Sequence, residues 1–238
     1  LFHIYLEVAH LISNCGTPEE LMQSIIGLLG AIVVIIKTIV LRVYWKNIEC
    51  IVSSAVGDWS RIKDQTSRDI MISWASIGRT FFIFQIMMTV AFISLAIIGH
   101  FPYFIFKTHN NVNGTVAMRM FPWSSSCWLS ETVDDQTFVI IYIWISIEAF
   151  AFTLHGTGID LALFIILTHL CGQIEILKVD VTTDRDFDAT KYSNMYRQFV
   201  QRHKHLYNLC VLLEEALSLV ILSHMLMYLT ILSTLCKY

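Results

Sequence analysis

The chain has 238 residues, of which 55% are hydrophobic and 15% are charged, and its mean hydropathy is +0.61. A soluble domain carries about 25% charged residues, and a soluble core would not bury several uncharged runs of roughly 20 residues. The net charge of −3 argues against nucleic acid as a partner. The sequence therefore predicts a membrane protein.

A helix needs about 20 apolar residues to cross roughly 30 Å of hydrocarbon. The first apolar segment, residues 1–13, is predicted to be the outer end of a helix that starts before this chain, so the chain is expected to be a fragment of a larger protein. Thr17, followed by Pro18, resembles a helix N-cap and a first-turn proline. The second span is predicted at residues 20–44, where the long stem of Lys37 is expected to reach the interface.

The remaining spans follow from the same pattern. Residues 47–76 are amphipathic, with apolar side chains at helical spacing, and are predicted to extend the membrane helices into the cytoplasm. Spans are predicted at residues 77–100, whose uncharged run covers 80–98, and at residues 137–171 and 205–236. The predicted fold class is an all-α polytopic membrane helix bundle with long helices extending into the cytoplasm, in a single transmembrane domain.

The uneven distribution of the 16 Lys and Arg residues predicts the orientation of the chain. Basic residues close to apolar spans tend to stay on the cytoplasmic side. Two basic connections are therefore expected inside and two basic-poor ones outside. Only Lys107, Arg119 and Lys237 lie outside the two basic stretches. The others are Lys37, Arg42, Lys46, Arg61, Lys63, Arg68 and Arg79, then Lys178, Arg185, Lys191, Arg197, Arg202 and Lys204.

Two features fall in segments assigned to the outside. Asn113 begins an Asn-Gly-Thr sequon, which is a candidate site for N-glycosylation and agrees with the predicted topology. Cys15 and Cys127 would face an oxidising environment, where they would either form a disulfide or remain two free thiols.

Ionisable residues inside a span are costly and are candidates for function. Glu148, His155 and Asp160 lie within the fourth span, either as a proton or metal relay or as groups facing the bundle interior, with Asp160 close to the inner interface. His155 and Asp160 are five residues apart, so they share a helical face poorly. No HExxH or CxxC motif accompanies them, so neither a metal site nor a cofactor is predicted.

The fifth span carries a second set of ionisable residues. His203 and His205 near the inner interface are either solvated anchors or ligands, and His224 is expected to face the bundle. One of Glu214 and Glu215, about two turns into the span, is a candidate for a bond to a neighbouring helix.

No catalytic residue is predicted, because neither a GxSxG motif nor a phosphate-binding Gly-rich loop is present. A binding or transport role needs only a mostly apolar cavity between helices, and the outer halves of the spans would line one. The candidate ligand-binding residues share faces at helical spacing, although ordinary helix packing would account for each of them as well: Ser94 and Ile98, then Tyr142, Ser146 and Ala149.

Several segments resemble the insect odorant receptors. Residues 169–177 (HLCGQIEIL) are similar to the family's His-x-x-Gly signature, where a span ends and runs into a long cytoplasmic helix. Residues 201–206 (QRHKHL) and 211–217 (VLLEEAL) resemble the stretch leading into its fifth span. Looser matches are residues 120–123 (MFPW), in the second outer loop, and 58–59 (DW), after the second span. The resemblance covers essentially the whole chain, and the order and spacing of these motifs are a stronger signal than any one of them.

The resemblance implies a seven-helix protein with a cytoplasmic N-terminus, opposite to G-protein-coupled receptors, whose last two helices lie beyond this chain. It implies a multi-pass plasma-membrane protein of olfactory sensory neurons. There it would be one subunit of an odorant-gated cation channel, a hetero-oligomer with an olfactory co-receptor, expected to be a tetramer. A small volatile organic ligand is expected in an outer-half pocket. The family's pore lies largely along its last helix, so no pore residue is assigned.

Three other classes of protein remain as alternatives. A gustatory receptor of the same superfamily would respond to sugars or bitter compounds rather than to volatiles. A G-protein-coupled receptor would have the opposite orientation, and no Asp-Arg-Tyr-like motif follows residues 80–98. A transporter would favour inverted repeats or broken helices, which the sequence does not indicate. An enzyme fits least well.

Overall fold

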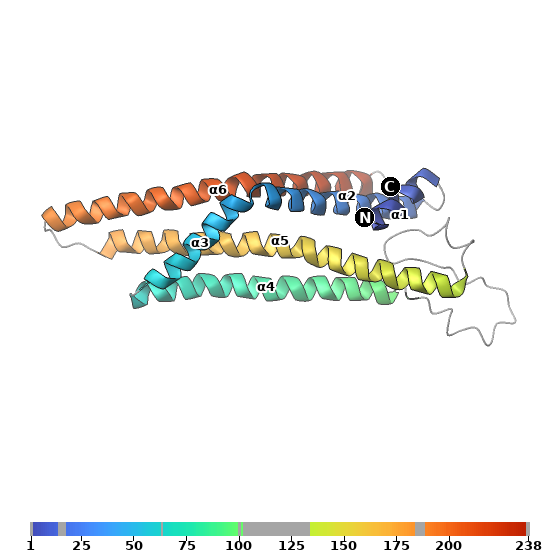
Figure 1. Ribbon diagram of the computed structural model, residues 1–238, viewed down its shortest axis with the longest axis horizontal. Coiled ribbons are helices and arrows are strands. Elements are labelled where there is room, and N and C mark those ends of the chain that lie inside the picture. Colours follow the sequence, from blue (N-terminus) through green and yellow to red (C-terminus); the bar gives the residue numbers. More distant parts are fainter. Residues whose placement is uncertain are drawn as a thin grey trace. The chain divides into compact units, whose positions relative to one another are not determined.

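The computed structural model describes residues 2–13, 18–62, 64–99, 101, 134–183 and 189–236 of the chain. The elements in these ranges are all α-helices, and no strand occurs among them. The all-α prediction is therefore confirmed. In chain order the helices are α1 (Phe2–Ser13), α2 (Pro18–Val43), α3 (Trp45–Arg61), α4 (Gln65–Gly99), α5 (Asp135–Thr183) and α6 (Ala189–Leu235) (Figure 1).

Four of these helices are long and apolar enough to cross a membrane: α2, α4, α5 and α6. The longest, α5, has 49 residues and extends about 74 Å at 1.5 Å per residue. That length is more than twice the roughly 30 Å of bilayer hydrocarbon. Both α5 and the 47-residue α6 must therefore continue well beyond the hydrocarbon region.

The amphipathic segment predicted over residues 47–76 is divided between two helices. Ile62 adopts an extended conformation (φ −69°, ψ 111°) and ends α3. Asp64 then caps α4, because its carboxylate accepts a hydrogen bond of 3.0 Å from the backbone N–H of Ser67. At the other end of α3 the hydrogen-bond ladder continues from α2, since the N–H of Tyr44 donates to the carbonyl of Val40 at 2.9 Å. The α2–α3 junction is therefore a kink and the α3–α4 junction a true break.

The residues group into two compact units, and α2, α4, α5 and α6 contribute to both. The core of unit 1 includes a cluster of Phe138, Tyr142 and Ile145, with Ile97 and Ile141 packed against it. The core of unit 2 includes buried side chains of α3, α4 and α5. Unit 1 comprises Leu1–Ile36, Ile86–Thr157 and Ser223–Tyr238, and unit 2 comprises Lys37–Gln85 and Gly158–Leu222.

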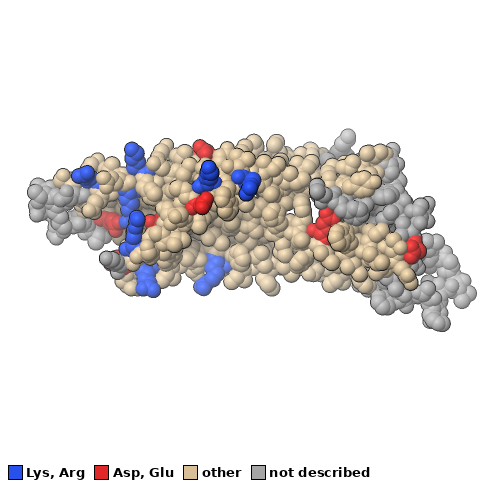
Figure 2. Space-filling model, viewed as in Figure 1, with Lys and Arg blue, Asp and Glu red and all other residues tan. Residues whose placement is uncertain are grey.

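The described basic side chains all belong to one of the two units. Every Lys and Arg side chain that the structure describes belongs to unit 2, and the described part of unit 1 contains none. Figure 2 shows several of them in blue on the face in view. The uneven distribution seen along the sequence is thus also a division between folded units. The basic side chains concerned are Lys37, Arg42, Lys46, Arg61, Arg68, Arg79, Lys178, Arg197, Arg202 and Lys204.

Candidate functional site

The five predicted ligand-binding residues all belong to unit 1. Tyr142 is the most deeply buried of them, with 2% of its surface exposed. Its hydroxyl donates a hydrogen bond to the backbone carbonyl of Ile97, and its ring meets Phe101 edge-on at 6.1 Å between centroids. Tyr142 therefore joins the end of α4 to the first half of α5.

The other four residues differ in their exposure. Ser146 and Ala149 are also buried, and their spacing places them on the same face of α5 as Tyr142. The Ser146 hydroxyl donates to the carbonyl of Tyr142 at 2.8 Å. On α4, Ser94 is partly buried and Ile98 is 57% exposed. Because the hydroxyls of Tyr142 and Ser146 already bond to backbone carbonyls, a ligand here would be held mainly by apolar contact.

The candidate glycosylation site, Asn113, lies outside the described residues. So do Cys15 and Cys127, which would either form a disulfide or remain two free thiols. Within the described ranges the cysteines Cys50, Cys171, Cys210 and Cys236 are free thiols.

The side chain of Lys37 is buried, with only 3% of the residue exposed. Its Nζ lies 2.7 Å from Oδ2 of Asp160, which joins α2 to α5 within unit 2. A buried ammonium is costly unless an anion is close, so the nearby carboxylate draws Lys37 into the bundle. Asp160 is thus part of a structural ion pair, and the described residues contain no group of three His, Cys, Asp or Glu side chains that could hold a metal ion.

One of the paired glutamates bonds to a neighbouring helix, as predicted. Oε2 of Glu215 in α6 accepts a hydrogen bond of 3.1 Å from the amide of Asn47 in α3. Nearby, His205 bonds to the hydroxyl of Ser54 at 3.0 Å, so this histidine also joins α6 to α3. His224 stacks on Tyr228 of its own helix, with 6.0 Å between the ring centroids.

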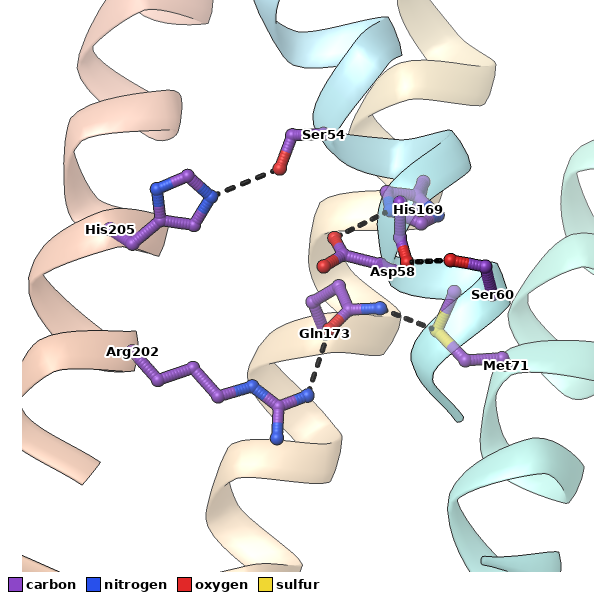
Figure 3. Close-up of polar contacts among 9 residues, drawn as sticks. Ser54, Asp58, Ser60, Met71, His169, Gln173, Arg202 and His205 are labelled. Carbon is purple, nitrogen blue, oxygen red and sulfur yellow. Dashed lines mark hydrogen bonds and ion pairs between the residues drawn. The ribbon is translucent and has the colours of Figure 1, made fainter. Parts of the chain in front are cut away.

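A polar network in unit 2 surrounds the HLCGQIEIL segment (Figure 3). His169 lies 3.4 Å from the carboxylate of Asp58 on α3. Gln173, which is fully buried, donates to the sulfur of Met71 at 3.5 Å and accepts a hydrogen bond from Arg202 at 3.0 Å. Arg202 also donates to Asp180 at 3.0 Å. The segment therefore connects α5 to α3, α4 and α6.

The glycine of this segment also has a packing role. A Cβ on Gly172 would lie 2.9 Å from the sulfur of Met71 and 3.4 Å from Cβ of Trp74. Gly172 therefore allows α4 to approach α5 closely. Two residues of the same pair of helices reinforce the contact, because the indole N–H of Trp74 donates to the carboxylate of Glu175.

Two cavities occur in unit 2, and none of the five predicted ligand-binding residues lines either of them. The first, of ≈ 550 Å³, is apolar and lies among α3, α4 and α5. The second, of ≈ 640 Å³, is polar and includes Asp58, Arg61, Asp180 and Arg202 in its wall. Residues of three or four helices form each wall, so the linear sequence offered little signal of either. The spacing of Val52, Val56 and Trp59 along one face of α3 is the clearest indication of the apolar cavity.

Comparison with protein families gives a match over nearly the whole chain. The family model described as "7tm Odorant receptor" matches residues 17–237, which is nearly the whole chain. A search of curated proteins found none that matches the chain at a significant level.

Proposed function

Because this chain belongs to the 7tm odorant receptor family, we propose that it is a subunit of an odorant-gated cation channel that assembles with an olfactory co-receptor. The observation that carries the proposal is the family match over residues 17–237. The four long apolar helices agree with a membrane receptor. The family consists of receptors rather than enzymes, and its name favours odorants over the sugars or bitter compounds of a gustatory receptor. The receptor would act in the plasma membrane of olfactory sensory neurons.

The proposed orientation places the basic residues of unit 2 on the cytoplasmic side. Its support is that the described Lys and Arg side chains all belong to this unit. Basic residues close to membrane spans are retained in the cytoplasm. The connection over residues 102–133 would then be extracellular, as would Asn113.

Glycosylation tests this orientation directly. We expect the receptor to carry an N-linked glycan on Asn113, because glycosylation requires the sequon to face the secretory lumen. A glycosidase should therefore increase the gel mobility of the wild-type protein and leave that of Asn113→Gln unchanged. A new sequon placed in the basic connection around Asp64 should stay unmodified. Modification there, with none at Asn113, would show the reverse orientation.

The proposed mechanism is a shift between closed and open populations. A ligand shifts such an equilibrium only through its different affinity for the two states. Apolar burial contributes about 25 cal/mol per Å² of surface. Since the hydroxyls of Tyr142 and Ser146 already have backbone partners, shape and apolar contact would dominate the recognition of a volatile ligand in unit 1.

Enlarging two small residues tests this ligand site. We expect Ser94→Leu and Ser146→Leu to shift the odorant concentration for half-maximal response by about tenfold or more, because one or two extra methylene-sized groups change binding by roughly 1–3 kcal/mol. Calcium imaging of cells that co-express the co-receptor provides the measurement. Ala91→Leu and Ala151→Leu are matched controls, since both residues are exposed on the same two helices. Unchanged responses for both serine variants at normal surface expression would exclude this site.

A further inference from the structure

The apolar cavity of unit 2 is separate from the residues proposed to bind odorants. Its volume of ≈ 550 Å³ falls within the roughly 300–1,000 Å³ of typical ligand pockets. Val52, Val56 and Trp59 of α3 form one wall, and Met71 and Phe82 of α4 form part of another. Such a lining favours hydrocarbon over water.

The polar groups of the α5 wall already have hydrogen-bond partners within the protein. The hydroxyl of Thr168 donates to the carbonyl of Ile165 at 2.9 Å. His169 directs its Nε2 towards Asp58, at 3.4 Å. An occupant of the cavity therefore needs little hydrogen-bonding capacity in the part that lies against α5.

Arg79 differs from the other lining residues because it carries a fixed positive charge. It is exposed, and no carboxylate among the described residues lies within salt-bridge distance of it. It directly precedes residues 80–98 of α4, an uncharged run that extends about 28 Å as a helix. If that run crosses the hydrocarbon, whose thickness it matches, Arg79 would lie near the lipid headgroups, where its guanidinium could pair with a phosphate.

The α3 helix has the character of a helix that lies in a membrane interface. It buries Ile48 and Ile51 against the rest of unit 2. Its exposed side presents Trp45, Val52, Val56 and Trp59, and Lys46 and Arg61 lie near its two ends. Since Glu49 and Asp58 balance these two basic residues, the helix carries no net charge, and its exposed apolar and aromatic side is what suits it to a membrane interface.

We propose that this cavity binds an anionic phospholipid of the cytoplasmic leaflet, with an acyl chain against the apolar walls and the headgroup phosphate paired with Arg79. The proposal rests on the orientation proposed above, because anionic lipids are concentrated in that leaflet. The apolar lining accommodates the chain, and the arginine supplies the charge that selects an anionic headgroup.

Native mass spectrometry of the purified receptor, delipidated in detergent and titrated with phosphatidylserine or phosphatidylcholine, tests the proposal. We expect one phosphatidylserine per chain to bind at least fivefold more tightly than phosphatidylcholine. Arg79→Gln should weaken phosphatidylserine binding about fivefold, which corresponds to about 1 kcal/mol for one basic side chain at an anionic surface. Arg68→Gln is the matched control, because Arg68 is an exposed arginine of the same helix that does not line the cavity.

Filling the cavity provides a second variant. Ala75→Phe should reduce binding of both lipids, whereas Ser73→Phe, away from the lining, should not. Equal affinity for the two lipids, equal losses for Arg79→Gln and Arg68→Gln, or unchanged binding in Ala75→Phe would each overturn the proposal. Displacement of the lipid by odorants would also overturn it, because the cavity would then be an odorant-binding site. The assay needs no odorant response, and the orientation is read independently from glycosylation of Asn113, so failures of the two proposals are distinguishable.

Discussion

Lys37→Met is expected to remove most of the receptor from the cell surface. The substitution keeps the length of the side chain but leaves the Asp160 carboxylate without the ammonium that lies 2.7 Å away. Breaking a buried ion pair costs about 3–5 kcal/mol. Because the Asp160 side chain is 39% exposed, the lower end of that range applies. A loss of about 3 kcal/mol is a large part of the roughly 5–15 kcal/mol that stabilises a typical fold.

Surface biotinylation and thermal unfolding in detergent measure this effect. Arg42→Met is the matched control, because Arg42 is an exposed basic residue on the same helix. The double variant Lys37→Met with Asp160→Leu should recover much of the loss, since replacing a buried pair by apolar residues is often close to neutral. Equal surface levels for Lys37→Met and Arg42→Met would contradict the structural role of the pair.

The second large effect is expected at Gly156. A Cβ there would lie 2.8 Å from Cγ2 of Val34, so α2 and α5 approach closely at this point. Valine has few accessible rotamers in a helix, and the two helices would have to separate to admit a larger side chain. Close approach at small residues is a main source of helix association in membranes. Gly156→Leu should therefore destabilise the receptor by about 1–3 kcal/mol, the usual cost of overpacking.

Gly158→Leu provides the comparison for this variant. A Cβ on Gly158 meets no atom within 4 Å, so a leucine there enters open space. Both substitutions replace a mid-helix glycine of α5 and gain the same intrinsic helix propensity. The difference between their unfolding temperatures isolates the contact with Val34. Equal unfolding temperatures would show that the close approach of α2 and α5 does not contribute to stability.

Much of the fold was predictable because membrane helices are specified by local composition. Uncharged runs such as residues 80–98 identify the spans, and helical spacing identified the amphipathic segment that became α3 and the start of α4. The division of that segment was not predictable from periodicity. It depends on the extended conformation of Ile62 and on the Asp64 cap, which are local features within a continuous apolar pattern.

Contacts between helices were much harder to predict. The sequence did not reveal that Lys37 pairs with Asp160, which lies 123 residues later. The bond of Glu215 to a neighbouring helix was predicted, but its partner Asn47 was not. The motif at residues 169–177 carries part of the resemblance to the family. The structure supplies its physical basis, which is the close packing at Gly172 and the hydrogen bonds of Gln173.

The central claim, that an odorant gates an ion channel formed with the co-receptor, is tested most directly by whole-cell recording from cells that express both subunits. GDPβS in the pipette blocks G-protein signalling. We predict a cation current that rises with odorant concentration, requires both subunits and persists in GDPβS. A response that GDPβS abolishes, or a current that is unchanged when this receptor is omitted, would contradict the account.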